Sequence, residues 1–191
     1  MTDALLSAVR NTDYVWDARL YVNDTDATDA DGIPSHSLAM VVEGGVDGQV
    51  AQAIWDKKAP GIGTWGSTSR TVTDSAGNGH TINYTPYADK MIQIYPYITL
   101  LAGGDQQAIT DAVVPAIVDY VDKLGLGNSL NIPQLYGVAY AANPAISNTF
   151  VVTDMQVSVP GTSGVVRTVV PCAWNEKITA VRNGGVSIRF S

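Results

Sequence analysis

The sequence predicts an α+β protein of two small mixed lobes, each a short sheet covered by one or two helices. Segments of alternating apolar residues, typical of strands, lie between segments whose apolar residues recur every three or four positions, typical of helices. With 191 residues and an apolar fraction of 46%, the chain can bury a core without a disulfide or metal. The pattern changes character in the second half, so we expect one lobe over 1–87 and another over 88–191.

The first lobe is expected to begin with a helix followed by two strands. Apolar residues with i, i+4 spacing predict the helix over 4–10, with Asp3 as its N-cap. A partly alternating segment predicts a strand over 14–22. The next strand, 36–43, is apolar on both faces, which is typical of a central, covered strand.

A second helix and a hairpin complete this lobe. The helix is expected over 47–58, with Asp47 as its N-cap, and Pro60-Gly61 ends it. Residues 74–79, Asp-Ser-Ala-Gly-Asn-Gly, are rich in turn formers. They predict a hairpin of two strands, 68–73 and 80–85.

The second lobe begins with the strongest strand signal of the chain, 91–101. A helix is expected over 105–124, and Pro115 inside it is expected to kink or split it. Pro133 is placed as the first residue of a short helix. Four short strands follow in sequence, at 150–159, 165–170, 177–181 and 186–190.

The charge balance excludes several classes of partner. There are 18 acidic and 11 basic residues, a net charge of -7, and the basic residues are scattered, which argues against nucleic acid. No apolar run approaches the roughly 20 residues of a membrane span. Residues 1–6 carry no basic signal-peptide region, and the single cysteine, Cys172, fits a reducing compartment. The low charged fraction of 15% fits either a surface covered by partners or one rich in small polar residues.

The sequence matches neither the EF-hand pattern nor the phosphate-loop pattern. Four aspartates precede Gly32 in the loop 23–34, but with Gly32 at position 6 of an EF-hand, positions 1 and 12 are Ala27 and Leu38. A solvated turn is the better interpretation. The Gly-Ile-Gly-Thr-Trp-Gly bend at 61–66 lacks the Lys-Ser/Thr of a phosphate loop, so its glycines are expected to permit close packing around Trp65. We therefore expect no metal and no cofactor.

Catalytic constellations are equally weak. A triad of Cys172, His80 and Asp74 is possible only on paper, and no Gly-x-Ser-x-Gly elbow supports it. Glu43 and Glu176 are the only glutamates, and a hydrolase of cell-wall sugars acting through carboxylates remains an alternative. The four tryptophans are spread one per element, which favours core anchors over a sugar platform: Trp16, Trp55, Trp65 and Trp174. Residue chemistry thus indicates a protein that is not an enzyme and has no small-molecule substrate.

Two runs of the first lobe resemble a known family. The pieces are Asn-Asp at 23–24, Gly-Ile-Pro-Ser-His at 32–36, Glu-Gly-Gly at 43–45 and the glycine bend at 61–66. In this order and spacing they resemble the baseplate J-like family of contractile-tailed phages and related contractile injection systems. The remainder of the chain up to residue 100 follows more loosely, and beyond residue 104 only the order of elements matches.

The resemblance implies a structural role. It implies a wedge protein that forms a ring with copies of itself around the central hub and contacts neighbouring wedge and hub proteins. The expected location is the tail baseplate of the virion, after assembly in the host cytoplasm. Aromatic residues dominate interface hot spots, so Trp65, Tyr95 and Tyr97 are the interface candidates, with plain core packing as the alternative for each.

Two departures from the family remain. Its members are usually longer and carry an N-terminal region that joins a central bundle, so this chain is expected to be a piece, a split half or a short relative. Tyr84-Thr85-Pro86 stands where the family more often has Arg-Pro after an aromatic residue. The alternative function is a carbohydrate- or receptor-binding module at a tail tip.

Overall fold

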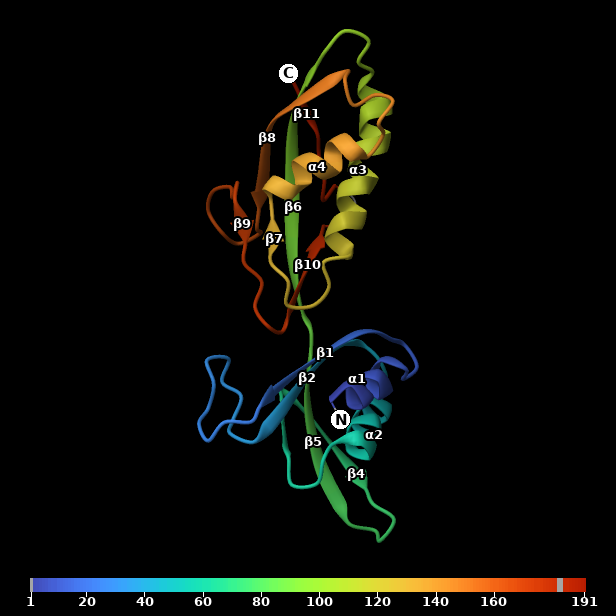
Figure 1. The fold of residues 1–191 in the computed structure, drawn as a ribbon, viewed down its shortest axis with the longest axis vertical. Helices are drawn as coiled ribbons and strands as arrows, with labels where there is room; N and C mark the ends of the chain where they lie inside the picture. Colours follow the sequence, from blue (N-terminus) through green and yellow to red (C-terminus); the bar gives the residue numbers. More distant parts are fainter. Residues whose placement is uncertain (1, 182–183) are drawn as a thin grey trace. The chain divides into compact units, whose positions relative to one another are not determined.

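The computed structural model describes residues 2–181 and 184–191, and the chain divides into two compact units, 1–88 and 89–191 (Figure 1). The boundary expected from the sequence lies one residue earlier. The described residues form four helices and eleven strands, and the strands pair in mixed sheets, which confirms the predicted α+β class. None of the helices in this part of the chain is long and apolar enough to cross a membrane.

The first unit is a five-stranded sheet with two helices. Its strands run in the order β1-β2-β5-β4, and β3 pairs with β2 beside this path. In chain order the elements are α1 (Thr2–Arg10), β1 (Val15–Asn23), β2 (Ser37–Gly44), α2 (Asp47–Lys57), β3 (Gly63–Trp65), β4 (Thr68–Thr73) and β5 (Gly79–Pro86).

Strand β2 is the centre of this sheet, as its apolar sequence predicts. It pairs antiparallel with β1 and parallel with both β3 and β5. The five residues from Leu38 to Val42 are each at most 4% exposed. Leu38, Met40 and Val42 form one core with residues of α1 and α2, among them Val9 and Ile54.

Both N-caps predicted for this unit are wrong. Asp3 lies within the first turn of α1, and Val46 rather than Asp47 occupies the N-cap of α2. The Asp47 carboxylate instead accepts a hydrogen bond of 2.5 Å from the Tyr84 hydroxyl and pairs with Arg70. These contacts lower the pKa of Asp47, the Tyr84 hydrogen bond most of all. The carboxylate therefore ties α2 to the neighbouring hairpin.

The second unit is built around the long strand β6. Strand β8 pairs with β6 antiparallel, β10 and β11 also pair with β6, and β7 pairs with β9 in a separate two-stranded sheet. In chain order the elements are β6 (Ala88–Leu100), α3 (Gln106–Asp122), β7 (Leu130–Asn131), α4 (Pro133–Ala141), β8 (Phe150–Ser158), β9 (Val169–Val170), β10 (Glu176–Ala180) and β11 (Arg189–Phe190).

Helix α3 continues past Pro115 without a break, so the expected split does not occur. Its buried residues lie three or four apart on both sides of the proline, at Ile109, Val113, Ile117 and Val121. Packing of this stripe against the sheet core outweighs the one backbone hydrogen bond that proline removes. The predicted strands 165–170 and 186–190 are shorter than expected, because their first parts make only the single bridges of Val166 to Val157 and Val186 to Ile94.

Candidate interaction surfaces

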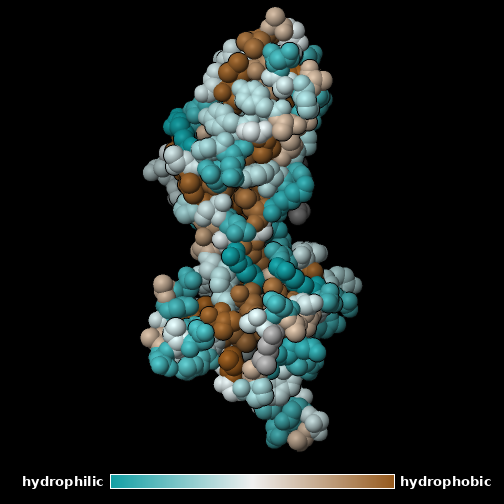
Figure 2. Space-filling model, in the orientation of Figure 1, coloured by the Kyte–Doolittle hydropathy of each residue, from teal (hydrophilic) through white to brown (hydrophobic). Residues whose placement is uncertain are grey.

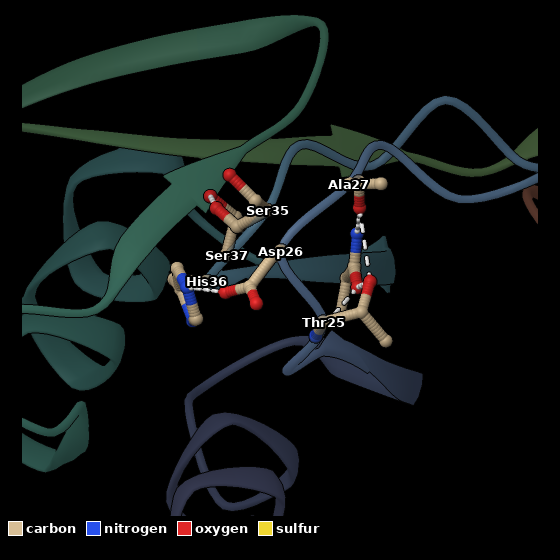
Figure 3. Close-up of polar contacts among 7 residues, drawn as sticks. Thr25, Asp26, Ala27, Ser35, His36 and Ser37 are labelled. Atoms are coloured by element: carbon tan, nitrogen blue, oxygen red, sulfur yellow. Dashed lines mark hydrogen bonds and ion pairs between the residues drawn. The ribbon is translucent and has the colours of Figure 1, made fainter.

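The aspartate-rich loop after β1 is closed by a buried asparagine, Asn23, which is 2% exposed. Its amide nitrogen donates to the carbonyls of Ala27 (2.8 Å) and Ile33 (2.7 Å). Its amide oxygen accepts from the backbone N–H of Thr25 (3.1 Å) and from the Thr25 hydroxyl (2.6 Å). Figure 3 shows the hydrogen bonds at Thr25 and Ala27. The Asn23 side chain therefore forms hydrogen bonds near the start of the loop, at Thr25 and Ala27, and near its end, at Ile33.

A histidine and an aspartate meet on the outside of this loop. His36 has a φ of 50°, an uncommon value for a residue other than glycine, and its Nε2 lies 3.0 Å from Asp26 Oδ1 (Figure 3). Both side chains are well exposed. Within residues 2–181 and 184–191, no group of three or more His, Cys, Asp or Glu side chains is placed to hold a metal ion.

Trp65 packs against this loop at Gly32. Its half-buried indole lies against Gly32, where an added Cβ would sit 3.8 Å from the ring atom Cζ2. The neighbouring Gly66 fits directly over the backbone of Tyr84, and an added Cβ would lie 2.2 Å from the Tyr84 carbonyl carbon. Within the bend, Gly66 therefore permits a close approach to the Tyr84 backbone, and the glycine that lies against Trp65 is Gly32.

Tyr95 and Tyr97 point away from the helices of the second unit. Ile92, Ile94 and Ile98 alternate with them on β6 and are buried in the core with residues of α3 and α4. The two tyrosines are half-buried on the opposite face of the sheet. Tyr95 and Tyr97 therefore lie on one surface of β6. Trp65, the third interface candidate, belongs to the first unit.

An arginine covers part of this surface. The guanidinium of Arg189 lies 5.4 Å from the centre of the Tyr95 ring, within the range of a cation–π contact. The Tyr95 hydroxyl donates to Gln93 Oε1 at 2.9 Å. The face thus combines tyrosine and arginine, residue types that are enriched at protein interfaces.

Two exposed aromatic residues were missed by the sequence analysis. Tyr14 is 75% exposed and Trp16 is 76% exposed, so the prediction that Trp16 is a core anchor is wrong. The physical reason is a β-bulge: Val15 pairs with Gly44 and Asp17 with Glu43, which leaves Trp16 as the extra residue. A bulge reverses the direction that simple alternation predicts for a side chain.

The backbone holds this aromatic pair in place at some cost. Tyr14 has a φ of 64°, which is unfavourable for a large side chain, and its carbonyl accepts from Gly45 N–H at 2.8 Å. An added Cβ on Gly44 would lie 2.3 Å from that carbonyl and 3.3 Å from the Trp16 ring. Trp16 therefore rests on a glycine, and we call this protrusion, Tyr14 with Trp16, the aromatic knob.

An apolar groove lies at the other end of β1, on the helix side of the sheet. It is lined by side chains from α1, β1, β2, the end of α2 and the segment after it, chiefly Leu5, Leu20, Val22, Leu38 and Ile62, with Lys57 among the lining residues. Val22 is 44% exposed. Figure 2 shows apolar surface on this side of the first unit, where α1 meets β1 and β2. We call this hollow the groove.

The carboxylates considered for catalysis are engaged in structural contacts. Glu43 is buried in the central strand β2. Glu176 accepts from the backbone N–H of Ala173 and pairs with Lys90 at 2.9 Å, and these contacts lower its pKa, the Ala173 bond most. A general acid needs the opposite shift.

Asp74 and His80 do meet, at 2.9 Å, but the His80 ring stacks on Trp55 at 4.0 Å between centroids. The contact with His80 is the largest of those that lower the pKa of Asp74. Cys172, the third residue of the triad considered above, lies in the second unit. Burial, and to a lesser extent the charge of Glu176, raises the pKa of its thiol. The thiol is therefore less disposed to ionise than an ordinary cysteine.

Comparison with known proteins leaves the family open. No model of a known protein family matches this chain, and a search of curated proteins returns no match.

Proposed function

We propose that this protein is a structural component of a contractile-tail baseplate, a wedge protein that works through contacts with copies of itself and with neighbouring wedge and hub proteins. Its place would be the virion baseplate, after assembly in the host cytoplasm. The observation that carries the proposal is the β6 face with Tyr95, Tyr97 and Arg189, whose composition is that of an interface centre.

The motif residues support the proposal in a second way. Asn23 closes the loop, Gly32 seats it on Trp65, and Gly66 brings the bend against Tyr84. Three of the four pieces that resemble the baseplate J-like family thus belong to one local structure, whereas Glu-Gly-Gly at 43–45 lies at the other end of β2. This cooperation is what a shared fold signature would require, and it gives the resemblance a physical basis.

The test is assembly with tail proteins. The chain is co-expressed with the proteins encoded next to it in the tail cluster and analysed by size-exclusion chromatography and negative-stain microscopy. A stable complex that the double variant Tyr95→Ser, Tyr97→Ser weakens at least ~30-fold supports the proposal, since interface anchors contribute at least this much. The matched control is Val165→Ser, an exposed apolar residue outside this face. A monodisperse monomer with every tail protein contradicts the proposal.

A carbohydrate-binding module is the second candidate, because the aromatic knob resembles in chemistry the stacking surfaces that hold sugar rings. Titration with soluble peptidoglycan and lipopolysaccharide fragments, followed by the indole N–H signal of Trp16, tests it. A saturable shift that Trp16→Ser abolishes supports this candidate. No shift at millimolar sugar excludes it.

A further inference from the structure

We propose that copies of this chain associate head to tail, with the aromatic knob of one copy seated in the groove of the next. The contact rests on the proposed structural function and specifies how one copy recognises another. Both halves of the contact lie within the first unit.

The knob has the form of a preorganised anchor. Trp16 exposes 76% of its surface and yet is fixed by the bulge and by Gly44 beneath its ring. A rigid aromatic side chain loses little conformational entropy on binding, which is why tryptophan dominates interface hot spots. Tyr14, next to it, has a φ of 64°, which costs about 1–2 kcal/mol, and the hydrogen bond from Gly45 N–H to its carbonyl holds this turn.

The groove matches the knob in polarity, because its lining side chains are chiefly aliphatic. Leu5 and Leu38 form parts of the lining that are nearly inaccessible, whereas Val22 remains 44% exposed. Seating an aromatic ring here would remove apolar surface of both copies from water.

Charges beside the knob and the groove are complementary. Asp13 directly precedes Tyr14 and is exposed, and Lys57 lines the groove at the end of α2, also exposed. Across residues 2–181 and 184–191, no ion pair engages either side chain. A knob that enters the groove brings an unpaired carboxylate toward an unpaired ammonium, which favours this partner over an uncharged one.

The knob cannot fill the groove of its own molecule. Trp16 and Val22 lie near opposite ends of β1, six residues and therefore about 20 Å apart along the strand. The two features can meet only between copies, and a pair joined in this way keeps a free groove on one copy and a free knob on the other. Such a heterologous contact propagates, into a closed ring or an open filament.

The test uses two variants that each disable one half of the contact. Trp16→Ser removes the knob and keeps the groove, whereas Val22→Asp places a charge in the groove and keeps the knob. Both positions are exposed, so the fold is retained, and circular dichroism checks this. In sedimentation velocity over a concentration series, wild type is expected to form dimers and larger species, and each variant is expected to associate at least ~30-fold more weakly.

Mixing the two variants gives the decisive measurement. The groove of Trp16→Ser accepts the knob of Val22→Asp, so the mixture is expected to form a 1:1 dimer and nothing larger. Asp13→Lys and Lys57→Glu are each expected to weaken association, and the two changes in one chain are expected to restore it. Leu101→Ser, at an exposed apolar residue of the second unit, is the control and is expected to behave as wild type.

Three outcomes overturn the inference. Wild type that remains monomeric at every concentration contradicts it, as does self-association that neither Trp16→Ser nor Val22→Asp weakens. A mixture of the two variants that stays monomeric contradicts it too. Binding to tail proteins is measured separately with the same variants, so loss of the knob contact and loss of the proposed function give different results.

Discussion

Replacing Asn23 by alanine should release the aspartate-rich loop without removing any residue of the main core. The side chain makes four hydrogen bonds, two as donor and two as acceptor, to Thr25, Ala27 and Ile33. Ile33 is 1% exposed, and its carbonyl also accepts from the Asp29 N–H at 3.1 Å, so this bond remains when Asn23 is replaced. At about 1 kcal/mol net per bond the four contribute about 4 kcal/mol, and the entropy regained by a freed loop returns part of this. We expect Asn23→Ala to lose about 3 kcal/mol of unfolding free energy.

The measurement combines urea unfolding with hydrogen exchange of the loop. Exchange should accelerate at the Ile33 amide, which donates to Asp29 Oδ1 at 2.8 Å, and should not change in the second unit. Asn23→Asp provides a matched variant, because it keeps the two acceptor bonds from Thr25 and loses both donors. It also places a carboxylate beside two carbonyl oxygens, so it is expected to be at least as destabilising as the alanine variant.

A small effect would refute this account of the loop. If Asn23→Ala loses less than about 1 kcal/mol and the loop amides remain protected, the loop is held by Ile33 and Trp65 alone. Thr25→Val separates the two contributions further. It removes only the hydroxyl, which donates to Asn23 Oδ1 at 2.6 Å, and is expected to cost about 1 kcal/mol.

Four further changes test other parts of the first unit. Gly66→Ala places a Cβ 2.2 Å from the Tyr84 backbone and should lower the unfolding free energy, measured in urea, by about 3 kcal/mol. Gly48 lies in helix α2, and an added Cβ there meets no other atom, so Gly48→Ala should raise the unfolding free energy by about 1 kcal/mol. Burial, and then the Asp47 contact, raise the pKa of Tyr84, so above pH ~10 the unfolded state loses a proton that the folded state keeps. Stability should therefore fall as pH rises past this value, and melting curves of Tyr84→Phe should show a smaller alkaline loss. Tyr14→Asn removes one ring of the knob and should raise the melting temperature, because asparagine adopts a positive φ at lower cost than tyrosine. An unchanged or lower melting temperature would mean that Tyr14 is not strained.

Elements with a clear period were predicted from the sequence, because burial decided them. The strand apolar on both faces is β2, the hairpin strand 68–73 has those bounds in the structure, and the stripe of α3 is buried as its spacing predicts. Where burial is not the deciding term, prediction failed. Strands β3 and β7 have three and two residues, too few to show a period, and their pairing depends on neighbours distant in sequence.

The errors at single residues have physical reasons. The N-cap of α2 was assigned to Asp47 because aspartate is common there, but a hydrogen bond to Tyr84, 37 positions away, decides its role. Trp16 is expected in the core because the four tryptophans are spread one per element, and the bulge that turns it outward leaves no composition signal. The sequence did offer one clue: Gly44-Gly45 stands opposite it, where a strand would ordinarily continue with side chains.

The residues that carry the family resemblance and those proposed to carry recognition are different sets. Asn23, Gly32 and Gly66 are constrained by internal bonds and close approaches, so their identity is fixed by the local fold. Trp16 and Val22 are both exposed, so a polar residue at either position would leave the loop and the bend intact. Motifs of the first kind identify an architecture even when its contacts have changed. A surface of the second kind must therefore be found from exposure and backbone strain, and it is tested by removing one half of the contact at a time.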